Sequence, residues 1–164
     1  MGSCDSAAPK KQNSASPYFD LKGFMEKEVK HLQKLNPEID KAVMVNDSEE
    51  HKKIKISDWQ KELSAFSDAD INKSAWQGLF SRQKNATEDT YTSDNDKVAV
   101  KSLTIQYKDH RIFKIQILMS NSNTLYTSRD TLSYFPDSLY EIRKTQHIKL
   151  LNQKSYRITG RFIF

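Results

Sequence analysis

The pattern of positions 18–35 predicts an amphipathic helix, because apolar side chains recur there at steps of three and four residues. We expect this helix to end at Asn36, since the residue before Pro37 avoids helical backbone angles. The predicted apolar stripe consists of Leu21, Phe24, Met25, Val29, Leu32 and Leu35.

Short elements are predicted between this helix and residue 96. Ser57 and Gln60 have the spacing of a capping box, which favours a helix after them. The small and acidic residues at 67–70 favour the start of another short helix. The remaining predicted elements are strands at 41–45 and 54–56 around a polar connection, and a polar loop at 81–96 with a short strand near Tyr91.

From Val98 onward the apolar period changes to two, which is the period of half-buried strands. Residues 98–107 and 113–119 are joined by only a few turn residues, so an antiparallel hairpin is predicted. Val98 and Val100 are out of phase with Leu103, and a β-bulge near 101–102 would reconcile them.

Further strands are predicted at 124–134, 140–150 and 155–164. On the last of these, Tyr156, Ile158 and Phe162 share one face with Gly160, and the arginines share the other. The prediction is a meander of about five antiparallel strands with its apolar face covered by the N-terminal helices, a two-layer α+β fold.

Residues 1–17 differ from the rest, because those after Cys4 are only small, polar or Pro residues. Such a segment cannot bury enough apolar surface to offset its ordering entropy. We therefore expect a flexible lipid-anchor tether at 1–17 and a single globular domain at 18–164.

Cys4 allows three interpretations. Gly-Ser-Cys resembles the end of a bacterial lipobox, which would make Cys4 the lipid attachment site once a leader is removed. Gly2 with Ser6 also fits eukaryotic myristoylation, with a palmitoyl chain on Cys4 beside it. The third interpretation is that Met1 to Ser3 are vector-derived residues ahead of an ordinary cysteine.

Charge is unevenly distributed along the chain, whose net charge is +5. Residues 1–82 are neutral, 83–96 are acidic, and 97–164 carry 12 basic against 4 acidic side chains. The C-terminal, strand-rich part is therefore the cationic part.

No apolar run in the sequence approaches the roughly 18 residues needed to span a bilayer.

No motif of catalysis or cofactor binding is present. The histidines lack the pairing of a zinc site, and the four glycines are too scattered for a phosphate-binding loop. No catalytic residue, cofactor or metal is therefore predicted. The four histidines are His31, His51, His110 and His147.

Two surfaces are candidates for binding. The polar face of the predicted sheet is basic and could hold an anionic glycan, lipid headgroup or nucleic acid by charge, although a solvated sheet face would look the same. If the sheet instead curves, its other face could line a pocket for an apolar ligand. The basic face comprises Lys114, Arg143, Lys149, Arg157 and Arg161; the apolar pocket comprises Phe113, Met119, Tyr126, Tyr134, Tyr140, Tyr156 and Phe162.

Two segments of the chain together resemble a family: DWQKELSAFSDADINKSAWQGLF at 58–80 and YEIRKTQHIKLLNQKSYRITGRF at 140–162. They are similar to small, uncharacterised lipoproteins of Bacteroidetes bacteria, with a lipobox cysteine, a polar tether, a helical half and a strand-rich half in this order. The similarity covers nearly the whole chain, without the signal peptide. It implies a role only for Cys4, as the lipid attachment site.

We therefore expect a non-enzymatic, membrane-tethered lipoprotein of the bacterial cell envelope that binds an envelope protein, glycan or lipid. Dual acylation would instead place it on the cytoplasmic membrane face of a eukaryotic cell. The alternative functions are carriage of a hydrophobic ligand and binding of an anionic polymer through the basic sheet face. Nucleic acid is not the expected partner, because the basic face lacks aromatic platforms for base stacking.

Overall fold

The computed structural model describes residues 17–164. The prediction of a lipid on Cys4 therefore lies outside the described residues. Among residues 17–164, no helix has the length and apolar character that a membrane span requires.

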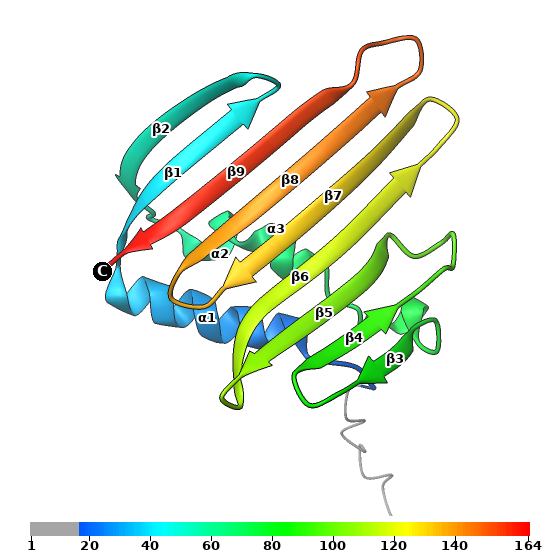
Figure 1. Cartoon of the computed structure of the whole chain (residues 1–164), viewed down its shortest axis with the longest axis horizontal. Coiled ribbons are helices and arrows are strands. Elements are labelled where there is room, and N and C mark those ends of the chain that lie inside the picture. The colour runs from blue at the N-terminus through cyan, green and yellow to red at the C-terminus, as the bar shows by residue number, and fades with distance from the viewer. Residues whose placement is uncertain (1–16) are drawn as a thin grey trace, which may run out of the picture.

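The described chain is mostly β, with one long helix and a single antiparallel sheet (Figure 1). The sheet has nine strands in the order β2-β1-β9-β8-β7-β6-β5-β4-β3. The five strands predicted for the meander are the central ones. The strands predicted at 41–45 and 54–56 form the β1–β2 hairpin on one side of them, and the strand predicted near Tyr91 belongs to the β3–β4 hairpin on the other side. The strands are β1 Glu38–Val45, β2 Ser48–Lys55, β3 Ser81–Lys84, β4 Glu88–Thr92, β5 Val100–Lys108, β6 Arg111–Ser122, β7 Tyr126–Phe135, β8 Leu139–Ile148 and β9 Lys154–Ile163.

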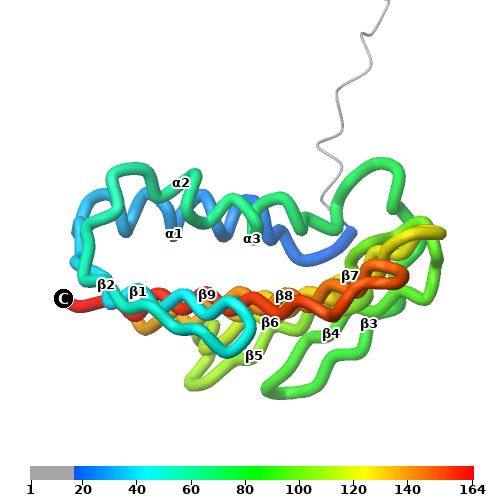
Figure 2. Tube along the Cα trace, turned by 90° about the horizontal axis from the view of Figure 1, so that it is seen from above, coloured from blue at the N-terminus to red at the C-terminus, as the bar shows by residue number. Residues whose placement is uncertain are grey.

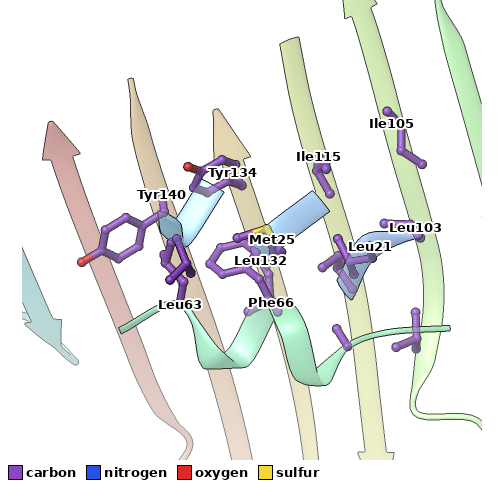
Figure 3. Packing of buried hydrophobic residues seen from close by; sticks show 14 of the residues in the cluster. Leu21, Met25, Leu63, Phe66, Leu103, Ile105, Ile115, Leu132, Tyr134 and Tyr140 are labelled. Carbon is purple, nitrogen blue, oxygen red and sulfur yellow. The ribbon is translucent and has the colours of Figure 1, made fainter. Parts of the chain in front are cut away.

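Helices cover one face of this sheet, as predicted (Figure 2). They are α1 Leu21–Leu35, α2 Trp59–Glu62 and α3 Ser64–Asp68, followed by a 3-10 turn, η1 Ser74–Trp76. Between helices and sheet, Met25 and Phe66 lie against strand residues such as Leu132 (Figure 3). The apolar sides of both layers are thereby removed from water, which is the main driving force of the fold.

The helix α1 confirms the prediction from periodicity. The Asp20 carboxylate accepts a hydrogen bond from the Gly23 amide at 2.9 Å and caps the start. Asn36 ends the helix in the left-handed conformation, with φ 46°. Of the predicted stripe, Leu21, Met25, Val29 and Leu32 are buried.

The next helices are shorter than predicted. Asp58, not Ser57, caps α2 by accepting from the Lys61 amide at 3.0 Å. The helix predicted from 67–70 is wrong, because the Asp70 carboxylate accepts from the Asn72 amide and turns the chain. The Asn72 side chain in turn donates to the Phe19 carbonyl at 2.9 Å and ties this turn to the start of α1.

The strands confirm the predicted period-two pattern from β5 onward. The β5–β6 hairpin closes through Asp109 and His110, both with positive φ, as in a tight two-residue turn. A register shift between Val100 and Ser102 confirms the predicted bulge. The segment 81–96 was predicted as a loop with a short strand near Tyr91. That strand is β4, and β3, which was not predicted, pairs with it as a hairpin.

Gly160 is required by close packing. A Cβ there would lie 2.2 Å from the Tyr140 ring, which is cross-strand to Gly160. The bare backbone of β9 therefore leaves room for this ring to lie between sheet and helices. Tyr140 reaches α2 in this way.

Candidate functional site

The face of the sheet opposite the helices, here called the open face, carries a group of cations. On the four strands β6 to β9, side chains alternate between buried core positions and this face. The register places five basic side chains and one carboxylate, Glu141, on the open face of these strands. The basic residues are Lys114, Arg129, Arg143, Arg157 and Arg161.

Arg143 and Arg157 lie directly opposite each other on β8 and β9. Like charges in this position destabilise a sheet by roughly 0.2–1 kcal/mol. Glu141 offsets part of this repulsion, because its Oε1 accepts a hydrogen bond from Arg143 Nε at 2.6 Å. Arg157 has no ion-pair partner among the described residues. Its charge is available to a ligand.

The structure brings together four of the five cations predicted for this face. The exception is Lys149, which lies in the turn after β8, since that strand ends at Ile148. The prediction also missed Arg129 on β7. Strand alternation could have predicted its position. Leu132 and Tyr134 are core residues, and Arg129 lies an odd number of residues from both, so its side chain points to the opposite face.

A groove of about 290 Å³ lies at one end of this face. Two cross-strand pairs of β7 and β8, Thr127 with His147 and Arg129 with Thr145, form its floor. Gln153 closes it from the β8–β9 turn. Guanidinium, hydroxyl and amide groups of this kind donate hydrogen bonds to carboxylate, sulfate or phosphate oxygens.

His147 is the histidine that lines this groove. Within residues 17–164, no hydrogen bond joins it to a hydroxyl or to a carboxylate. In the same part of the chain, no three His, Cys, Asp or Glu side chains gather as metal ligands would.

The residues predicted to line an apolar pocket do not come together around one cavity. Tyr134, Tyr140 and Phe162 fill the core, and the centroid of the Phe162 ring lies 6.3 Å from that of Tyr134 and 6.1 Å from that of Tyr140. Phe113 is instead half exposed and contacts Phe135 edge-on. The other three, Met119, Tyr126 and Tyr156, are partly buried.

A second polar centre lies on the covered side of the sheet. Glu62 Oε1 accepts hydrogen bonds from Lys41 Nζ at 2.6 Å and from the Tyr140 hydroxyl. Burial and this carboxylate raise the pKa of Tyr140, so the phenol stays protonated as a donor. A groove of about 410 Å³ opens beside these three residues. Their charges are satisfied internally.

The edge of the sheet at β3 and β4 holds a similar internal pair. Arg82 donates to the Asp89 carboxylate through Nε and Nη2, both at 2.8 Å. This bidentate contact from Arg82 lowers the pKa of Asp89, and it outweighs the burial of the carboxylate, which acts in the opposite direction. Tyr91 also donates to Asp89 at 3.4 Å. This pair fastens the edge hairpin and offers no free charge.

No protein-family model, curated protein or solved structure matches this chain. The resemblance to Bacteroidetes lipoproteins therefore stays a prediction. The open face is the candidate site on the evidence of its own residues.

Proposed function

We propose that this protein is a non-enzymatic binding module whose open face holds an acidic glycan. The observation that carries the proposal is the direct pairing of Arg143 and Arg157, which costs stability and leaves cationic donors facing solvent. Proteins tolerate such local costs mainly where function needs them.

The surroundings of these arginines favour a glycan over nucleic acid. Thr127, Thr131, Thr145 and Thr159 lie on the same face, and their hydroxyls can donate to and accept from sugar hydroxyls. Single-stranded nucleic acid would require exposed aromatic platforms beside the cations. Among the Phe, Tyr and Trp residues of β7–β9, only Phe135 lies on the open face, and its ring contacts Phe113 and Lys114.

Binding to alginate, a polymer of uronic acids, tests this proposal. We expect the double variant R143Q/R157Q to bind at least about tenfold more weakly at low ionic strength, since charge-assisted bonds contribute roughly 1.5–3 kcal/mol each. The matched control is K27Q/K30Q, which removes two exposed charges from α1 instead. Equal binding by both double variants, or equally tight binding of single-stranded DNA, would reject the acidic-glycan site.

We also propose that the module is tethered to a membrane through Cys4. Support comes from the lipobox-like residues before Cys4 and the polar segment after it. Intact-mass measurement on protein made from the full gene in a bacterial host tests this directly. A diacylglycerol-modified Cys4 is expected, and an unmodified Cys4 with Met1 as the true start would contradict it.

A further inference from the structure

Three leucines are exposed at neighbouring turns of the sheet. Leu125 precedes β7, and Leu150 and Leu151 lie in the turn between β8 and β9. Their exposed fractions are 68%, 95% and 60%, so they contribute almost nothing to the core. Large apolar side chains grouped in this way at a surface mark a contact with another apolar phase.

The two turns are held together as one structure. The Lys149 amide donates a hydrogen bond to the Leu125 carbonyl at 2.9 Å, and the Leu151 amide donates to the Ile148 carbonyl at 3.0 Å. Figure 1 shows both turns side by side at the upper right, whereas the helices cross the other part of the strands. Leu125, Leu150 and Leu151 are therefore named the leucine tip.

Leu150 adopts a backbone conformation that leucine disfavours. Its φ is 69°, in the left-handed region where Gly and Asn are the usual residues. This position thus combines backbone strain with nearly complete exposure of an apolar side chain. Neither feature stabilises the fold, and strain of this kind is typically retained for function.

The charges around the leucine tip are all of one sign. Lys149 and Lys154 lie in or beside the same turn, and Arg129 follows Leu125 on β7. Residues 110–129 and 142–164 contain no Asp or Glu. A tip with exposed leucines and flanking cations is complementary to a bilayer with anionic headgroups.

We propose that the leucine tip inserts into the interface of an anionic lipid bilayer. Leu125, Leu150 and Leu151 enter the acyl boundary, and Lys149 and Lys154 remain among the headgroups. A protein partner fits less well, because three leucines on protruding turns offer far less than the roughly 1,000 Å² of a stable interface. This contact uses neither Arg143 nor Arg157, on which the proposed glycan site rests, and it needs no lipid on Cys4; Arg129 borders both surfaces.

Vesicle flotation with full-length protein carrying unmodified Cys4 tests the proposal. The vesicles contain phosphatidylcholine, alone or with phosphatidylglycerol. We expect L150N/L151S to bind the anionic vesicles at least about tenfold more weakly, because each buried leucine contributes roughly 1.5–3 kcal/mol. Asparagine suits the left-handed backbone at this position, so the variant should fold. The matched control L35S/L118S, which changes exposed leucines elsewhere, should bind as the wild type does.

A direct readout of insertion is the fluorescence of L150W quenched by brominated acyl chains. Quenching is expected for L150W, also in the R143Q/R157Q background, and not for the native Trp59 and Trp76 alone. Three outcomes would overturn the proposal: no binding by the wild type, unchanged binding by L150N/L151S, or no quenching. Concentration-dependent dimers that L150N/L151S abolishes would likewise overturn it, by showing that the leucine tip joins two copies of the chain.

Discussion

The two faces of the sheet differ in how their charged side chains are paired. On the covered side, Glu62 accepts from Lys41 and Tyr140, Asp89 accepts from Arg82, and Glu28 accepts from the Tyr134 hydroxyl at 2.7 Å. On the open face, Glu141 pairs with Arg143, and Arg157 opposite it has no ion-pair partner among the described residues. Burial explains the pairing on the covered side, because moving a polar group out of water without a hydrogen-bond partner costs free energy, whereas water hydrates the same group on the open face.

The contrast separates residues that hold the fold from residues that are free to act. Changes on the covered side are expected to alter the free energy of unfolding, and changes on the open face are expected to alter binding. Substitutions on either side test this separation.

The largest effect is expected for G160V. Valine suits a strand better than glycine, by up to about 1 kcal/mol. Its side chain would nevertheless collide with the Tyr140 ring, so we expect a net loss of about 3 kcal/mol in urea unfolding. The control T159V, one residue away on the open face, should change stability by less than about 0.5 kcal/mol.

A collision with Tyr140 also predicts non-additivity. In the G160A/Y140L double variant the ring is gone, so its loss of stability should be smaller than the sum of the two single losses. Additive losses would show that Gly160 is needed for another reason.

A smaller effect is expected for E62Q. The amide retains an acceptor for Tyr140 but leaves the Lys41 ammonium without a counter-charge in a half-buried position. We expect a loss of about 1–2 kcal/mol in the free energy of unfolding. E26Q, an exposed change on α1, is the control. If both variants unfold alike, the covered side does not depend on internal pairing.

A pH-dependent effect is expected for E28Q. Burial raises the pKa of Glu28, against the hydrogen bond from Tyr134, so the folded state holds this proton more tightly than the unfolded state does. The wild type therefore loses stability as pH rises from about 4.5 through the raised pKa. E28Q should be more stable at pH 7 by roughly 0.5 kcal/mol, and the gain should vanish in acid. A gain that is independent of pH would contradict this.

The smallest effect on folding is expected at the open face. R157Q removes the repulsion opposite Arg143 and should raise stability at low salt by roughly 0.3 kcal/mol, while it weakens alginate binding. High salt should abolish the gain by screening. A loss of stability would place Arg157 with the residues that hold the fold.

Periodicity along the chain predicted the elements that bury one face. The apolar stripe from Leu21 to Leu32 and the alternation from Leu103 to Phe162 arise because one side of each element is buried. Both patterns predicted the correct type of element. Most of β2 shows no such pattern, because this edge strand is almost entirely exposed and its sequence SEEHKKIK is charged. Only its last two residues fall within the strand predicted at 54–56. Charged residues at an edge prevent pairing with other chains. Because the residues of β2 are charged and exposed, the strand has almost no apolar periodicity by which the sequence could predict it.

The pairing of β1 with β9 was also beyond prediction. Nothing in the local sequence of β1 indicates that Glu38 pairs with Ile163 at the other end of the chain. The basic face was largely predictable, because strand alternation fixed the direction of Arg157 and Arg161. Lys149 was misplaced because the end of β8 depends on the left-handed turn at Leu150, an unfavourable conformation that sequence propensity argues against.

The position of β9 constrains the order in which the molecule can assemble. β9 is the last strand along the chain, yet it lies between β8 and β1 and joins the β1–β2 hairpin to the sheet. During synthesis α1 and the local hairpins, β1–β2 included, can form early. The β1–β2 hairpin can join the rest of the sheet only when residues 154–163 are available to form β9. Closing so long a loop is slow. Until residues 154–163 are available, β1 and β8 both present unpaired edges, so the nascent chain is prone to aggregation at that stage.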